Sequence, residues 1–157
     1  ISKADKRQLD FLLGRSLGRL LAGTAYLGMV NLRDLEVTLA GVAAQYDKGY
    51  GLHLGGEEDL QAVGRAFIRQ LSRKQRKAVE DPARAYAALE PIGMQAWAEA
   101  AAQGAARCGL LASASLSAAV SVLKADGTNE EELAGLAIFN ISPRYAEARQ
   151  RLGLAGE

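Results

Sequence analysis

The sequence has few of the residues that build disulfide frameworks, metal clusters or membrane spans. Its 157 residues include one cysteine, one histidine and three prolines, and only 6% are aromatic. The single cysteine, Cys108, excludes a disulfide framework within the chain and favours a reducing compartment, so we expect a cytoplasmic protein. The single histidine, His53, excludes a site that needs two imidazoles. No apolar run approaches the roughly 20 residues that span a bilayer, so we expect no membrane insertion.

Charge is nearly balanced, with 19 Lys and Arg residues against 18 Asp and Glu residues and a formal net charge of +1. No overall field therefore attracts nucleic acid or an anionic membrane. Local basic residues occur in two places, which are a run of Arg73, Lys74, Arg76 and Lys77 and a C-terminal segment with Arg144, Arg149 and Arg151. Such a run is more often a solvated face than a phosphate-binding site. Nucleic-acid binding through residues 73–77 and 144–151 is thus a weaker alternative than binding to a protein.

Apolar residues recur at helical spacing along most of the chain, and no useful length of sequence alternates with period two. The first helix carries its apolar residues at Leu9, Leu12, Leu13, Leu17, Leu20 and Leu21. We predict helices from a cap at Ser2 to near Gly23, over about 32–47, from Glu57 to Leu71, over a short basic segment after Ser72, and from Asp81-Pro82 to about Leu89. Four more are predicted at 95–112 after Pro91, from about 113 to Gly127, after a cap at Thr128, and from Ser142-Pro143 to Gly153. The fold class is therefore all-α, a compact bundle of seven to nine helices in one domain over residues 1–157. The missing initial Met suggests a piece of a longer or processed protein.

The bundle should be organised around the alanine-rich helix over residues 95–112. Its larger polar residues, Glu99, Gln103 and Arg107, are spaced by four and form one polar stripe, while the rest of the circumference is apolar or small. Other helices should therefore cover it closely. We expect Trp97 to anchor the core and Cys108 to be a packed structural thiol.

Two segments resemble a known family. Residues 13–19, LGRSLGR, have the frame of the LGHELGH active-site helix of HtpX-like and CAAX-protease-like zinc metallopeptidases. Residues 96–111, AWAEAAAQGAARCGLL, are similar to the second metal-site helix of that family, roughly EWSRxxExxADRAGLL, and match it at Trp97, Ala105, Arg107, Gly109, Leu110 and Leu111. Residues 135–154 also resemble the metallopeptidase-like end of some large bacterial tetratricopeptide-repeat proteins. The resemblance covers about residues 8–23 and 94–154, whereas the middle of the chain resembles nothing we can name.

The resemblance implies a metal site whose ligands are gone. The family holds zinc with two histidines four residues apart and a glutamate from a second helix, and the residue after the first histidine is a glutamate that acts as general base. The corresponding positions here are Arg15, Ser16, Arg19 and Ala102, and Ala106 replaces a further acidic residue. A guanidinium cannot ligate a metal, and one about 4 Å from a dication would repel it by roughly 8 kcal/mol at an effective dielectric of about 20. We therefore expect no zinc, no other cofactor and no peptidase activity.

Two further expectations concern polar residues. If the two helices still cross as in the family, Arg15 and Arg19 would point toward Glu99, and an interhelical ion pair could fill the former metal site. The alternative is that both arginines reach solvent and bury only their stems. The glycine-rich segment 47–56 should be a loop, and together with the basic run it offers a possible partner surface at Tyr50, His53, Arg73, Lys74, Arg76 and Lys77.

The function that these expectations favour is a non-catalytic protein-interaction or scaffold domain with a metallopeptidase-like fold. Its partner would be another protein or another domain of the same chain. An enzyme with an unrecognised site and a nucleic-acid-binding domain are the alternatives.

Overall fold

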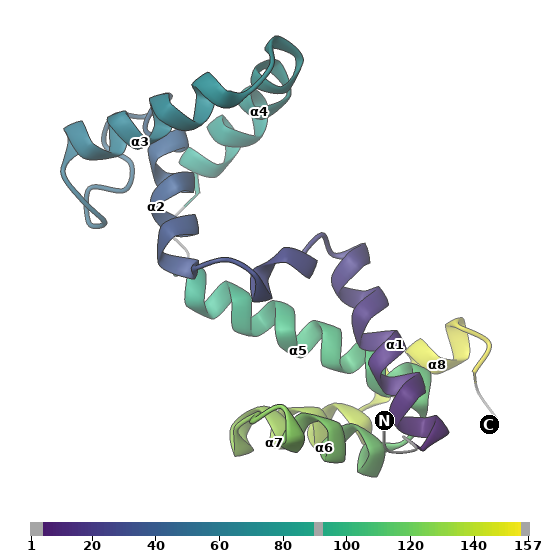
Figure 1. The fold of residues 1–157 in the computed structure, drawn as a ribbon. Coiled ribbons are helices and arrows are strands. Elements are labelled where there is room, and N and C mark those ends of the chain that lie inside the picture. Colours follow the sequence, from purple (N-terminus) through teal and green to yellow (C-terminus); the bar gives the residue numbers. More distant parts are fainter. Residues whose placement is uncertain (1–4, 90–92, 155–157) are drawn as a thin grey trace. The chain divides into compact units, whose positions relative to one another are not determined.

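The computed structural model describes residues 5–89 and 93–154, and this part of the chain contains helices and no strands (Figure 1). The prediction of an all-α fold is confirmed. The described residues form α1 (Lys6–Leu21), the 3₁₀ turn η1 (Ala25–Gly28), α2 (Leu32–Ala43), α3 (Glu57–Gln70), α4 (Arg73–Ala87), α5 (Met94–Ser113), α6 (Leu116–Ala125), α7 (Glu130–Asn140) and α8 (Pro143–Arg151). The predicted cap Ser2 and the predicted start at Pro91 lie outside the described residues.

Helix starts follow the capping residues of the sequence, with two differences. The N-cap of α1 is Asp5 and not the predicted Ser2. The Asp5 side chain accepts a hydrogen bond in the first turn of α1, and Asn31 does the same for α2. For α7, the cap is Asn129 and not Thr128, because the Asn129 side chain accepts a bond from the N–H of Glu132 at 2.8 Å. The Asn129 side chain is thus better placed than that of Thr128 to accept from the unpaired N–H groups in the first turn of α7.

Three helices end at glycines in the left-handed conformation. Gly23, Gly127 and Gly153 follow α1, α6 and α8 with φ of 65°, 79° and 70°. This conformation is costly for residues with a Cβ atom. The predicted ends of these helices are therefore correct.

Helix α4 continues through Pro82, although the sequence suggested two helices that meet at Asp81-Pro82. The proline removes one hydrogen bond from the helix interior, which costs about 3 kcal/mol in an exposed helix. Packing of the residues that follow it holds the helix together, because Ala83 is buried and Tyr86 packs on the core formed with α2. Tertiary packing has outweighed the local signal.

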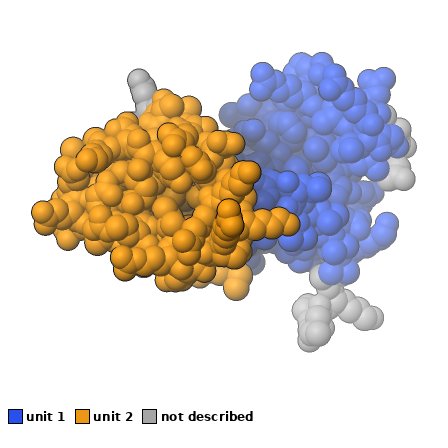
Figure 2. All heavy atoms as spheres, turned by 90° about the horizontal axis from the view of Figure 1, so that it is seen from above, with its two compact units in different colours: residues 1–26, 98–157 blue, residues 27–97 orange. Residues whose placement is uncertain are grey.

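The chain divides into two compact units, residues 1–26 with 98–157 and residues 27–97 (Figure 2). The prediction of one domain over residues 1–157 stays a prediction, but each unit has a core of its own. Only the first unit is built around the predicted central helix, since residues 98–113 of α5 belong to it.

The first unit depends on a close crossing of α1 and α5. A Cβ atom added to Gly14 would lie 2.6 Å from the Cβ of Ala112, and one added to Gly109 would lie 2.7 Å from the carbonyl oxygen of Phe11. Neither distance leaves room for a side chain. The core of this unit lies beside the crossing and is formed by Phe11, Ala106, Leu110, Ala119, Leu123 and Leu136.

Two residues of α5 are more exposed than the sequence led us to expect. The Trp97 side chain is 36% exposed and therefore does not act as a buried anchor. Cys108 is also exposed, although a Cβ on Gly18 would lie 2.9 Å from its sulfur. The thiol thus sits at the α1–α5 crossing but is open to solvent, because α5 is covered on only part of its circumference.

The second unit is built on an equally close crossing of α2 and α3. A Cβ on Gly64 would lie 1.9 Å from the carbonyl oxygen of Gly41, so only glycine fits at this position. Beside the crossing, the Gln45 amide donates to the side-chain oxygen of Gln61 at 2.8 Å, and the Gln61 amide donates to the carbonyl of Ala44. These bonds fix the register of the two helices.

The α1–α5 crossing gives a direct test of the fold. Gly14→Ala should lower the free energy of unfolding by about 1–3 kcal/mol, because the added methyl group overpacks a closed contact. Gly104→Ala on the same helix pair is the control, since nothing lies within 4 Å of its added Cβ. It should raise stability by about 0.5–1 kcal/mol. Urea denaturation followed by far-UV circular dichroism measures both, and a Gly14→Ala variant as stable as the native chain would contradict the crossing.

Candidate functional site

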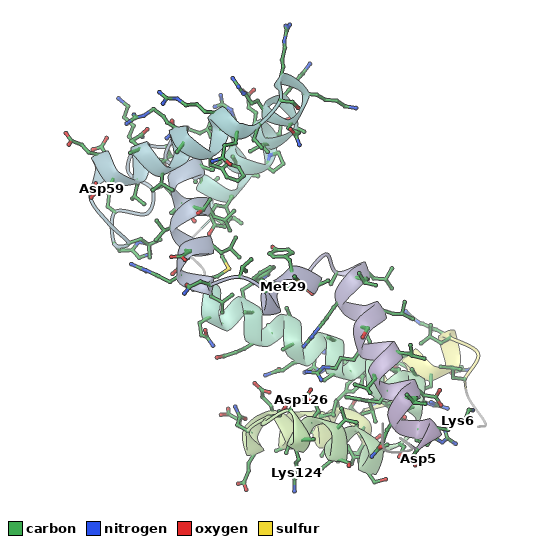
Figure 3. All side chains as sticks on the ribbon, in the orientation of Figure 1. Asp5, Lys6, Met29, Asp59, Lys124 and Asp126 are labelled. Carbon is green, nitrogen blue, oxygen red and sulfur yellow. The ribbon has the colours of Figure 1, made fainter. Side chains whose placement is uncertain are left out.

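Two arginines of α1 face the interior of the first unit. The Arg15 guanidinium donates from Nη1 to the Asp126 carboxylate, at the end of α6, at 2.5 Å (Figure 3, which labels Asp126). The Arg15 side chain is only 15% exposed, and its Nε is buried without a hydrogen-bond partner. The Asp126 carboxylate therefore provides a counter-charge to this mostly buried guanidinium.

Arg19 lies in the same electrostatic environment. Its pKa is lowered first by burial and then by the positive charge of Arg15, while Asp126 opposes the shift. A guanidinium nevertheless stays protonated at physiological pH. Two permanent cations thus lie close to the half-exposed Asp126 carboxylate.

The cleft beside Arg15 contains most of the positions that the family resemblance assigned to the metal site. Arg15, Ala102 and Ala106 line it together with Gln103, Arg107, Leu123, Thr128, Glu132, Gly135 and Leu136. Ser16 is exposed on α1 and is not part of this lining, and neither is Arg19. The space is about 30 Å³, which is room for one or two water molecules.

Asp126 is the residue of this cluster that sequence reasoning missed. It is the C-cap of α6, where a negative charge faces the negative end of the helix dipole. An anion in this unfavourable position is a signal that a tertiary partner compensates for it. The structure gives Arg15 this partner, and the predicted approach of Glu99 to either arginine stays a prediction.

The described residues contain no cluster of metal-ligating side chains. No group of three or more His, Cys, Asp or Glu side chains is arranged to hold a metal ion there. Within the same residues, no helix combines the length and the hydropathy needed to cross a membrane.

The outer face of α1 exposes large apolar side chains. The exposed fractions run from 39% at Leu12 to 90% at Leu21, and the members of this leucine face are Leu9, Leu12, Leu13, Leu17, Leu20 and Leu21. Together they form a patch on the order of several hundred Å², the size that marks interaction surfaces in soluble proteins. The leucines have the predicted helical spacing, but their side chains face outward and not toward the core.

The predicted partner surface on the second unit is only partly at the surface. Tyr50 is 8% exposed and packs on the Tyr86 ring at 5.4 Å, so it belongs to the core and not to a docking surface. Burial and the hydrogen bond with Tyr86 raise the pKa of Tyr50. His53 is exposed, and so are the four basic residues Arg73, Lys74, Arg76 and Lys77.

The C-terminal arginines do not form a phosphate-binding strip. Arg149 is 8% exposed and donates from Nη1 to the carbonyl oxygen of Leu111 at 2.9 Å and from Nη2 to that of Leu154. This side chain ties α8 to the end of α5 and is not available to a ligand. Arg144 and Arg151 remain exposed.

Comparisons with known proteins give no match, whether with protein-family models, with curated proteins or with solved structures. The resemblance to zinc metallopeptidases therefore rests on the sequence segments 13–19, 96–111 and 135–154.

The Arg15–Asp126 pair can be tested by removing the anion. Asp126→Asn should lower the free energy of unfolding by about 1–2 kcal/mol, because the mostly buried Arg15 guanidinium loses the counter-charge of its ion pair. The loss is smaller than for a fully buried pair, since the Asp126 side chain is half exposed. The control is Glu147→Gln, an exposed carboxylate with no ion pair in the described residues.

Adding Arg15→Met to Asp126→Asn should recover most of the loss, since the uncompensated charge then disappears. Thermal and urea denaturation of the native chain and of these three variants measure the loss and its recovery. Equal stabilities for Asp126→Asn and Glu147→Gln would show that the pair carries no stability.

Proposed function

We propose that this chain is a non-catalytic protein-interaction module, a helical metallopeptidase-like fold whose metal site has been replaced. The observation that carries the proposal is the leucine face of α1. Its partner would be another polypeptide or another part of the same chain.

The distribution of side chains on α1 supports this role. The helix turns Phe11, Gly14 and Gly18 toward the first unit and leaves its leucines in water. Full burial of one leucine side chain contributes about 1.5–3 kcal/mol. A helix that faced only solvent would gain from polar residues at these positions, so the leucines fit a face that another chain covers.

The chemistry of the inner face supports the absence of a metal. Arg15 occupies the place that the resemblance gives to a metal ligand, and its charge is matched by Asp126. Ala102 and Ala106 of α5 line the same cleft, so the helices that would carry the family's ligands do meet there. This meeting is what the metallopeptidase-like arrangement requires.

Restoring the ligands tests the metallopeptidase-like arrangement. The triple variant Arg15→His, Arg19→His and Ala102→Glu should bind one zinc ion per chain, because it returns two imidazoles and a carboxylate to the family positions. The native chain and the variant Arg15→His, Arg19→His and Ala98→Glu are the controls, since Ala98 lies one turn earlier on α5 and outside the cleft lining. Competition with a chromogenic chelator measures the affinity. A triple variant that binds no more tightly than the Ala98 control would refute the arrangement.

Photo-crosslinking tests the interaction role. A photoreactive amino acid at Leu13 or Leu17, in the protein expressed in its own cells, should give a discrete adduct of higher mass. The same amino acid at Gln150, which is exposed on α8, is the control and should give none. With the photoreactive amino acid at Leu9, the double substitution Leu13→Ser and Leu17→Ser should abolish the adduct and leave the thermal midpoint of the protein unchanged. Identical products from α1 and from Gln150 would remove the basis for the proposal.

A further inference from the structure

A second surface, on the other compact unit, has properties that the leucine face lacks. A groove of about 430 Å³ lies between α2 and α4, with Phe67 of α3 as its third wall. Its lining is hydrocarbon apart from the hydroxyls of Thr38 and Tyr86. A volume of this size is within the range of ligand sites. The groove is independent of α1 and of the Arg15 cleft.

The groove has the length and the periodicity of a helix-binding site. Its lining positions on α2 run from Leu35 to Val42 and those on α4 from Ala78 to Tyr86, each about two helical turns or roughly 12 Å. On both helices they recur at the three- and four-residue spacing that follows one helix face. Two apolar walls of this length fit the apolar face of a third helix, as in helix-in-groove recognition.

The charge at the α3–α4 end of the groove favours an acidic occupant. The walls carry acidic residues next to the lining, which are Asp34, Glu36, Glu80 and Asp81, and of these Glu36 and Glu80 pair with Arg33 and Arg84. Residues 60–79, which end α3 and begin α4, contain Arg65, Arg69, Arg73, Lys74, Arg76 and Lys77 and no acidic residue. All of these basic side chains are exposed, and none forms an ion pair within the described residues. Nitrogen-tipped side chains project outward at the α3–α4 end of the unit in Figure 3. Carboxylates of a partner would meet cations that nothing else neutralises.

We infer that the groove between α2 and α4 is the docking site for an acidic amphipathic helix of a partner protein. Leucine-like side chains of the partner at i, i+3 or i+4, and i+7 would enter the groove, and Asp or Glu residues on its flanks would face the basic segment 65–77. The concave form of the site argues against a membrane, which is bound by apolar side chains that project from a surface. The hydrocarbon lining argues against nucleic acid, because it offers no donor to phosphates or bases.

Fluorescence anisotropy with synthetic peptides tests the inference. The probe is a labelled alanine-based helical peptide of about 18 residues, with leucines on one face and glutamates beside them. One control peptide carries lysine in place of each glutamate, and another keeps the glutamates but distributes the leucines around the helix. The native chain should bind the probe at least about tenfold more tightly than either control, and added salt should weaken this binding.

Two variants place a carboxylate inside the groove, and one matched variant places it outside. Ala78→Glu and Pro82→Glu alter exposed lining positions, whereas Ala85→Glu alters an exposed position of the same helix that does not line the groove. Pro82→Glu should raise the thermal midpoint, since it removes a proline from a helix interior, and it should still weaken probe binding at least about tenfold. This separates a blocked site from an unfolded one. Ala85→Glu should bind like the native chain.

Three results would overturn the inference. The first is equal binding of the acidic probe and both control peptides, and the second is unchanged probe binding by Pro82→Glu. The third is tight binding to duplex DNA or to anionic phosphatidylserine vesicles that Pro82→Glu leaves intact while the acidic probe does not bind. None of these results affects the crosslinks from α1, so the proposed interaction role of the leucine face stands or falls separately.

Discussion

The contact on which the first unit depends is the approach of α1 to α5 at positions without side chains. Gly14 and Gly109 let the two backbones come so close that an added Cβ would lie within 3 Å of atoms on the other helix. Because α1 is held by these small residues, its bulky leucines are not needed for the contact and lie on the outer face. The close crossing also carries Arg15 into the cleft formed with α5 and α7. The same constraint therefore produces both the exposed apolar face and the buried charge.

The buried charge and the exposed leucines suit the same role. A mostly buried arginine next to a carboxylate adds little net stability, since desolvation offsets most of the attraction. The pair instead fixes the end of α6 against α1 and occupies the place where the family resemblance would put a metal. An inner face with fixed charges and an outer face with exposed apolar side chains are both consistent with the proposed interaction role.

The two candidate interaction surfaces differ in what they recognise. The leucine face of α1 is convex and apolar, and its flanking charges are of both signs, with Lys6 and Asp10 paired along the helix. The α2–α4 groove is concave, and the basic segment 65–77 lies at its α3–α4 end. A convex apolar ridge suits a partner with a groove of its own, whereas the groove suits a helix with acidic flanks.

Local sequence signals determined the helices. Capping residues such as Asn31, left-handed glycines such as Gly23 and the helical spacing of apolar residues act within a few bonds, so they can be read without knowledge of the fold. The exceptions are positions where packing outweighs a local signal, as at Pro82, which lies inside α4 because Ala83 is buried and Tyr86 packs on the core formed with α2. The all-α class and most helix ends thus follow from the sequence.

Only the tertiary structure decided which face of each helix is buried and which charges meet. The spacing of the leucines in α1 is the same whether they face a core or water. The glycines on the opposite face of α1 are the ones that pack on α5, because they allow the two helices to approach more closely. The sequence likewise marks Arg15 and Asp126 as charged residues, but they are far apart along the chain. Their pairing depends on α6 folding back beside α1, an outcome of packing across the whole unit that no local pattern encodes.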